Sequence, residues 1–153
     1  MYNRILVPVD GSPTSSRGLQ EAIKLARLTG ARLRLMHVVD ELALASGLEA
    51  ATMMTGDMMQ LLREGGARLL AKARARAEKA GVPVDSVLCD SLAGRICDQV
   101  VDQAKSWRAD LIVLGTHGRR GVGRMLLGSD AEMIVRLAPV PVLLVRAKEA
   151  AKA

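Results

Sequence analysis

The stretch Arg4-Ile-Leu-Val-Pro-Val-Asp10-Gly-Ser12-Pro13 carries a complete strand-to-helix transition near the start of the chain. Its apolar run is continuous rather than alternating, which is typical of a strand buried on both faces and predicts a strand over Arg4–Val9. Asp10 closes the run, and Ser12 followed by Pro13 is the pattern of an N-cap residue and the first residue of a helix. A buried strand that passes directly into a helix favours a parallel sheet covered by helices.

Further strands and helices follow in the same alternation. Continuous aliphatic runs predict strands at Arg32–Val39, Val84–Asp90, Asp110–Gly115 and Pro141–Arg146. Capping residues and apolar stripes at helical spacing predict helices at Ser12–Gly30, Asp57–Ala80, Ala93–Ser106 and Ser129–Leu137. Strands alternating with helices predict an α/β fold, a three-layer sandwich with an open five-stranded parallel sheet and four main helices.

The composition limits the kind of ligand. The chain has 153 residues, the size of one domain, with 22 Lys and Arg against 16 Asp and Glu. Of the cations, 16 are Arg, and Arg suits bidentate contact with phosphate or carboxylate, so we expect an anionic ligand. Aromatic residues make up only 1% of the chain, which argues against modules that stack single-stranded nucleic acid on aromatic rings. We therefore do not expect nucleic acid as a partner.

Cysteine usage and hydropathy indicate a cytoplasmic protein. Cys89 and Cys97 do not form a C-x-x-C motif and are interpreted as small buried thiols in a reducing compartment. The apolar run Ile5–Val9 is too short for the hydrophobic region of a signal peptide. The charge-free stretch Leu137–Val145 contains two prolines and cannot span a bilayer. We expect one domain over residues 1–147, a short tail at 148–153 and no membrane segment.

A glycine-rich segment from Gly115 to Ser129 is the main candidate for binding chemistry. Glycines let backbone N–H groups approach an anion closely, and the segment ends where a helix N-terminus favours phosphate. No carboxylate occurs between Asp110 and Asp130, whereas three arginines do. The segment therefore predicts a phosphate site. The alternative is a structural loop, in which Ser129 and Glu132 form a capping box for the following helix.

Two widespread phosphate-binding motifs are absent. Gly118 and Gly123 have the glycine spacing of a Walker A motif, but Arg124-Met125 stands where that motif requires Lys followed by Ser or Thr. Gly121-Val122-Gly123 lacks the third small residue of a dinucleotide-binding fingerprint. We therefore expect neither a P-loop NTPase nor an ordinary dinucleotide-binding enzyme.

Asp10 has two interpretations. In open α/β sheets, ligands bind beyond the carboxyl ends of the strands, at the point where the strand order reverses. Asp10 stands at such a strand end, where it could accept hydrogen bonds from a ribose or hold a metal-bound water. Alternatively, it closes an Asx turn or caps the following helix.

No catalytic arrangement is apparent in the sequence. His37 and His117 belong to no catalytic or metal-binding motif, and His37 is interpreted as a buried, hydrogen-bonded histidine. The pair Gly65-Gly66 lies in the middle of a predicted helix, where glycine is unfavourable, so we expect close packing or a kink there.

Several segments together resemble the universal stress protein family. They are the opening Arg4–Ser12, the strand Leu35–Val39, the spaced motif Gly115-x-x-Gly118-x9-Gly128-Ser129 and the run Ala138–Val145. The resemblance covers essentially the whole chain, and the glycine motif is that of the ATP-binding branch. It implies the adenine nucleotide alpha hydrolase-like fold with sheet order 3-2-1-4-5. The switch point would then lie between the strands that end at Asp10 and Gly115.

The resemblance also implies a nucleotide site. The implied contacts to adenine and ribose are Pro8, Val9, Asp10, Val38, Leu114 and Gly115. The implied contacts to the triphosphate are Gly118, Arg119, Gly128 and Ser129. The cofactor would be ATP, with Mg²⁺ or Mn²⁺ held mainly by its phosphates and without a metal site made of protein ligands. Asp130 departs from the family pattern, in which this position is often a neutral aliphatic residue. A carboxylate there is bridged by a divalent metal, points to solvent or lowers the affinity for phosphate.

The implied function is that of a nucleotide-dependent regulator in stress response, acting on a client protein that the sequence does not identify. Two alternatives stay open, a slow ATPase of the same fold and a nucleotide-independent interaction protein. The last strand opens with Pro141 and leaves Val142–Val145 without a guarding charge, which invites pairing with another chain. Because universal stress proteins typically dimerise through this strand, we expect a homodimer formed by antiparallel pairing of Val142–Val145.

Overall fold

Strands and helices alternate along the chain as their sequence patterns predict. The computed structural model describes residues 1–40, 56–90, 94–116 and 127–146. The strands are β1 (Arg4–Pro8), β2 (Arg32–Val39), β3 (Val84–Asp90), β4 (Leu111–Gly115) and β5 (Val142–Val145). The helices are α1 (Pro13–Thr29), α3 (Gly56–Lys79), α4 (Ile96–Ser106) and α5 (Ser129–Leu137). Differences from the predicted elements are confined to their ends.

The strands form one parallel sheet in the order β3-β2-β1-β4-β5. β1 lies between β2 and β4, with Pro8 opposite Met36 and Leu6 opposite Ile112. Among the described strands, β5 pairs with β4 alone, so it forms one edge of this sheet. The predicted fold class and strand order are therefore confirmed.

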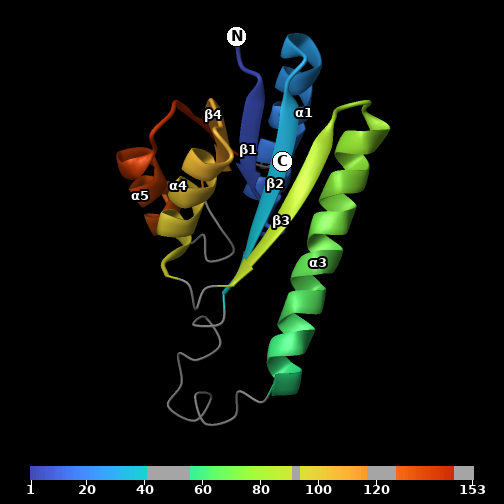
Figure 1. The fold of residues 1–153 in the computed structure, drawn as a ribbon, viewed down its shortest axis with the longest axis vertical. Coiled ribbons are helices and arrows are strands. Elements are labelled where there is room, and N and C mark those ends of the chain that lie inside the picture. The colour runs from blue at the N-terminus through green and yellow to red at the C-terminus, as the bar shows by residue number, and fades with distance from the viewer. Residues whose placement is uncertain (41–55, 91–93, 117–126, 147–153) are drawn as a thin grey trace, which may run out of the picture.

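Helices cover both faces of the sheet (Figure 1). α1 and α3 lie on one face, and their apolar residues pack with side chains such as Ile5, Leu33 and Leu35. α4 and α5 lie on the other face and pack with Leu6, Met36 and related residues. The two cores are largely aliphatic, because strand side chains alternate between the faces and the buried ones are mostly Val, Leu and Ile.

α1 begins and ends where its sequence predicts. Ser12 is the N-cap, and its Oγ accepts a hydrogen bond from the Ser15 N–H at 3.1 Å. Gly30 closes the helix in the left-handed conformation, with a φ of 74°. By contrast, α4 begins at Ile96, later than predicted. Its N-cap Arg95 is extended and Gly94 has a φ of 128°, so the backbone just before Ile96 is not helical.

The glycine pair of α3 packs closely at one residue only. A Cβ atom at Gly66 would lie 2.7 Å from Cδ2 of His37 and 2.8 Å from Cδ1 of Leu88. A Cβ atom at Gly65 would meet nothing within 4 Å. The predicted close packing is therefore confirmed for Gly66, where a side chain would require His37 and Leu88 to shift.

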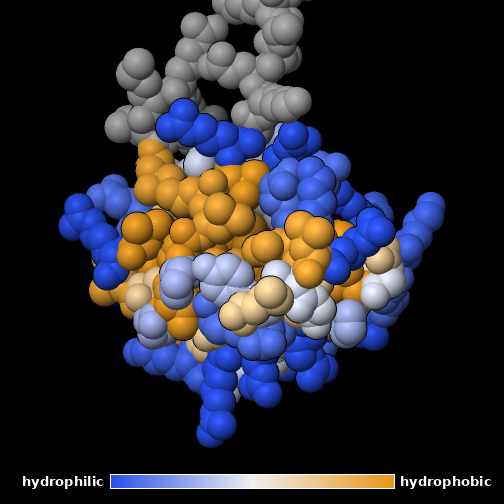
Figure 2. Space-filling model, turned by 90° about the horizontal axis from the view of Figure 1, so that it is seen from above, coloured by the Kyte–Doolittle hydropathy of each residue, from blue (hydrophilic) through white to orange (hydrophobic). Residues whose placement is uncertain are grey.

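Some large hydrophobic residues remain at the surface. Leu143 and Leu144 of the edge strand are 40% and 37% exposed, and Leu28 at the end of α1 is 82% exposed. Figure 2 shows hydrophobic side chains gathered into one area of the surface and bordered by hydrophilic ones. None of the described helices combines the length with the hydropathy that a membrane-spanning segment requires.

Candidate functional site

The candidate site lies at the carboxyl ends of β1 and β4. These strands are neighbours at the centre of the sheet, and the strand order reverses between them. The chain leaves β1 for α1 on one face and leaves β4 for α5 on the other (Figure 1). The two connections therefore diverge, which is the geometry that opens a ligand crevice in parallel α/β sheets.

A network of short-range hydrogen bonds fixes Asp10 at the end of β1. The Ser12 N–H donates to Oδ1 of Asp10 at 2.8 Å, which closes an Asx turn. The Asp10 N–H donates to Oγ of Ser15 at 3.1 Å. The Asx-turn interpretation is thus confirmed. A turn held in this way presents the Asp10 carboxylate in one orientation, which is also what a ligand-binding role requires.

His37 supports the same turn from the neighbouring strand. Its side chain is 6% exposed, and its Nδ1 lies 2.7 Å from the Val9 carbonyl oxygen. Because a carbonyl only accepts, Nδ1 carries the proton and donates. The Val9 N–H donates in turn to the Met36 carbonyl at 2.8 Å. The prediction of a buried, hydrogen-bonded histidine is confirmed, and its partner is backbone of the candidate site.

Gly115 brings the end of β4 against the first turn of α1. A Cβ atom at this position would lie 2.6 Å from the carbonyl carbon of Thr14 and 2.7 Å from the backbone nitrogen of Ser15. The neighbouring atoms belong to backbone, so they cannot swing aside. Gly115 therefore has a packing role that the sequence did not reveal, since a strand-end glycine before a glycine-rich loop is equally typical of a turn.

The N-terminus of α5 is tied to the end of β4. The Gly128 N–H donates to the Thr116 carbonyl at 3.0 Å, and the Thr116 N–H donates to the Val145 carbonyl at 3.0 Å. Gly128, at the start of α5, thus lies beside the carboxyl end of β4. The first N–H groups of α5, which lack partners within the helix, start at this point. A helix N-terminus is accordingly placed beside the crevice.

The capping box of Ser129 and Glu132, considered as the alternative for this segment, is not formed. The N-cap is Gly128 rather than Ser129, and it makes no side-chain capping hydrogen bond. Ser129 is already the first helical residue, and the Glu132 carboxylate accepts from Nη2 of Arg136 at 2.8 Å. The backbone bond between Gly128 and Thr116 fixes the helix start one residue earlier, so the hydroxyl of Ser129 has no capping role.

The apolar residues predicted for the site divide between the two faces of the sheet. Leu114 is buried on the face covered by α4 and α5, and Val38 is partly buried on that same face. Val9 is buried in the other core, under α1 and α3. Val9 can therefore contact a ligand only through its backbone, because its side chain points away from the face that holds Val38 and Leu114.

The structure brings together most of the predicted site residues. Pro8, Val9, Asp10, Val38, Leu114, Gly115, Gly128 and Ser129 all lie at or next to the carboxyl ends of β1, β2 and β4 or at the start of α5. Gly118 and Arg119 lie outside the described residues. His37 was not among the predicted site residues, although it directly precedes Val38, which was.

Asp130 is exposed in the first turn of α5, and its negative charge influences Cys97 in α4. Burial raises the pKa of the Cys97 thiol, and the carboxylates of Asp98 and Asp130 raise it further. Burial also raises the pKa of Cys89. Both cysteines are free thiols; Cys97 is buried as expected, whereas Cys89 is only partly buried. Within the described ranges no group of three metal-ligating side chains comes together.

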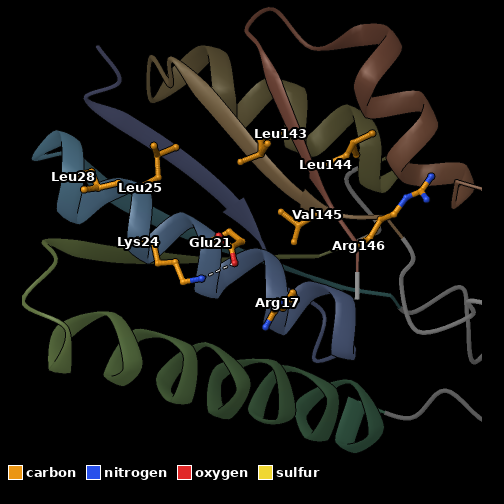
Figure 3. Close-up of a pocket in the computed structure, with 9 residues that line it drawn as sticks. All are labelled: Arg17, Glu21, Lys24, Leu25, Leu28, Leu143, Leu144, Val145 and Arg146. Atoms are coloured by element: carbon orange, nitrogen blue, oxygen red, sulfur yellow. Dashed lines mark hydrogen bonds and ion pairs between the residues drawn. The ribbon is translucent and has the colours of Figure 1, made fainter. Parts of the chain in front are cut away.

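A separate groove of about 500 Å³ lies between α1 and β5 (Figure 3). Leu25, Leu28, Leu143 and Val145 supply apolar side chains to it, and charged residues of α1 lie along it. None of the predicted nucleotide-site residues lines this groove. It belongs to the edge strand rather than to the switch point.

Known proteins resemble this chain over nearly its full length. A model of the Universal stress protein family matches residues 1–146. A universal stress protein of Methanocaldococcus jannaschii is 36% identical over 147 residues, covering 95% of this chain and 83% of the relative. The solved structure of a hypothetical protein from the same organism has a TM-score of 0.83 at 25% identity, covering 98% of this chain and 99% of the other. A universal stress protein from Archaeoglobus fulgidus, solved in complex with dAMP, has a TM-score of 0.68 at 26% identity, covering 94% and 98%.

Proposed function

This chain belongs to the universal stress protein family, and we propose that it is a cytoplasmic regulator that binds ATP at the carboxyl ends of β1 and β4. The adenine and ribose lie against Pro8, Val38 and Leu114, on the face that α4 and α5 cover. Asp10 accepts hydrogen bonds from the ribose, and Gly115 lines the ribose side. The triphosphate extends toward the start of α5, where Gly128, Ser129, Gly118 and Arg119 hold it.

The observation that carries this proposal is the bond between Gly128 and Thr116. It places the N-terminus of α5 beside the strand end that faces Asp10 across the switch point. The N–H groups of a helix's first turn and the helix dipole favour an anion at such an end. The Archaeoglobus fulgidus relative, whose structure contains dAMP, supports an adenine nucleotide as the ligand.

The proposed divalent ion, Mg²⁺ or Mn²⁺, is held mainly by the phosphates of ATP. Asp10 accepts from the Ser12 N–H through Oδ1, and Asp130 lies in the first turn of α5. Such donors suit an ion that brings its other ligands with the nucleotide, because Mg²⁺ is commonly bound through one or two carboxylates together with substrate phosphates.

Binding and regulation, rather than rapid hydrolysis, fit the side chains near the proposed site. The described histidine closest to it in sequence, His37, is buried and donates to backbone, so it is not placed to deprotonate a water. The alternative, a slow ATPase, requires Asp10 or Asp130 as the base. Sustained turnover by the wild-type protein, lost in Asp10→Asn, would favour that alternative.

We further propose a homodimer in which β5 pairs antiparallel with β5 of a second copy through Val142–Val145. This strand has one unpaired edge, and Leu143 and Leu144 are substantially exposed. An apolar strand edge without a charge or bulge favours pairing with another strand. A closed two-fold pairing covers the edge and is the commonest symmetry among soluble oligomers.

Identification of the bound ligand tests the proposed function directly. Freshly purified protein is denatured, and the released small molecules are analysed by mass spectrometry. We expect ATP in an amount comparable to that of the protein, and its absence from Gly128→Glu prepared in parallel. Release of no adenine nucleotide, followed by no binding of added ATP, would contradict the proposal.

A further inference from the structure

We propose that α3 sets the geometry of the nucleotide-binding turn, and that the contact between Gly66 and His37 transmits this control to Val9 and Asp10. His37 is thus a positioning residue, which acts on the ligand through backbone of β1. The inference rests on the proposed function for its consequence on affinity, but its structural part concerns the free protein.

The peptide unit that joins Val9 to Asp10 is held at both ends. Its carbonyl accepts from Nδ1 of His37 at 2.7 Å, and its N–H donates to Oγ of Ser15 at 3.1 Å. Rotation of this peptide plane would break both bonds. The Asp10 Cα follows this peptide directly, so His37 and Ser15 together position the Asp10 side chain.

α3 holds the His37 ring from the other side. Gly66 is buried, and a Cβ atom built at this position would lie 2.7 Å from Cδ2 of the His37 ring. The same missing Cβ would lie 3.3 Å from Nε2. The ring therefore fills the space between the helix and the Val9 carbonyl. A displacement of α3 toward the sheet would push the ring against the end of β1.

α3 contacts the same turn at a second point. Gly11 follows Asp10 with a φ of 80°, and a Cβ there would lie 2.9 Å from Cδ1 of Leu69. Leu69 is three residues after Gly66, so the two contacts lie on one side of the helix. The turn from Val9 to Gly11 is thus shaped at two places by α3, and a small shift of this helix changes both.

Two polar contacts support the position of α3 along the sheet. Arg63 donates to both carboxylate oxygens of Asp90 at the end of β3, at 3.2 and 3.1 Å. Arg76 donates to Oγ of Ser16 in α1 at 2.8 Å. Both contacts are exposed, so they add modestly to the packing that aligns Gly66 with His37.

Adjacent glycines provide a matched pair of variants. Gly66→Ala and Gly65→Ala add the same methyl group to the same helix and raise its helix propensity equally, but only the first meets the ring. We expect Gly66→Ala to weaken ATP binding by about tenfold or more, because it displaces a buried hydrogen-bond donor. Gly65→Ala should stay within about twofold of wild type. Melting temperatures of all variants are measured alongside.

Two substitutions of His37 separate positioning from packing. His37→Asn keeps a donor near Nδ1, whereas His37→Leu fills the space without one. Positioning predicts that Asn retains affinity within about threefold and that Leu loses about tenfold or more. A purely structural histidine predicts the reverse order, because a buried apolar residue tolerates Leu better than Asn. That reverse order would overturn the inference.

The amide resonances of Asp10 and Gly11 in the nucleotide-free protein give a readout that does not depend on ATP. We expect Gly66→Ala and His37→Leu to shift them and Gly65→Ala to leave them in place. Unshifted resonances in the first two variants would overturn the inference, whether or not ATP binds. Shifted resonances in these two variants, together with a wild-type protein that does not bind ATP, would uphold the positioning role and contradict the proposed function.

Discussion

The backbone N–H of Gly128 donates to the carbonyl of Thr116 across 3.0 Å. This bond holds the start of α5 beside the carboxyl end of β4. The N-terminus of α5 and the Asp10 turn therefore flank the switch point between β1 and β4. The proposed nucleotide site follows from this arrangement, since it joins a helix N-terminus to an oriented carboxylate.

A negative charge at the start of α5 should abolish ATP binding. Gly128→Glu places a carboxylate where the proposed triphosphate meets the helix N-terminus, so it adds both bulk and repulsion. Calorimetry should show no measurable heat of binding, with little change in melting temperature. Val135→Glu adds the same charge to an exposed residue further along α5 and is the control. Equal affinity in Gly128→Glu and wild type would show that the triphosphate does not bind at this helix N-terminus.

Removal of the Asp130 charge should strengthen ATP binding when no divalent ion is present. A carboxylate in the first turn of α5 repels a phosphate bound at the same helix end, by about 1 kcal/mol or less where solvent screens both charges, so Asp130→Asn should gain about twofold to fivefold in affinity. Glu132→Gln serves as the comparison, because Arg136 already pairs with that carboxylate at 2.8 Å. Titrations in EDTA measure both. Weaker binding by Asp130→Asn in the presence of Mg²⁺ would instead assign Asp130 to the metal.

A methyl group at Gly115 should destabilise the whole fold. Its Cβ would stand 2.6 Å from the backbone carbonyl carbon of Thr14, so β4 and α1 must separate. We expect Gly115→Ala to lower the free energy of unfolding by about 1–3 kcal/mol, as overpacking of a well-packed core does. Urea denaturation measures the change, with Gly65→Ala as the unstrained control. A stability equal to wild type would show that this contact relaxes without cost.

Charges on the edge strand should convert the dimer into a monomer. Leu143→Lys combined with Leu144→Lys places two cations at exposed positions of β5, which opposes pairing with a second copy. Val145 is a poor target because it is buried on the face of the sheet where α1 packs against β5. Light scattering at micromolar concentration should give the dimer mass for wild type and for Leu61→Lys, an exposed position on α3. A monomeric wild type, or a dimeric double variant, would exclude this interface.

The arrangement of strands and helices was predictable from local patterns. Continuous aliphatic runs mark buried strands, and β2 and β3 have the predicted bounds because nothing competes with those runs. Ser12-Pro13 and Gly30 define α1 because capping depends on neighbouring residues alone. Asp10 was open to two interpretations from the sequence, and the structure confirms its Asx turn.

Features set by distant contacts were not predictable in the same way. Ser129 has the sequence of an N-cap, but Gly128 takes that place because its N–H bonds to Thr116 in a preceding strand end. Gly115 reads as a loop glycine, yet the backbone of α1 excludes a side chain there. The pairing of Gly66 with His37 joins residues of two separate elements, and no local pattern in either element specifies the other.

The central claim, that the switch point between β1 and β4 binds ATP, is tested most directly by titrating nucleotide-free wild-type protein with ATP and Mg²⁺ in a calorimeter. The account predicts saturable binding of one ATP per chain, with no binding of CTP under the same conditions. Absence of a heat signal with ATP at protein and ligand concentrations up to the millimolar range would contradict it, as would equal affinity for CTP.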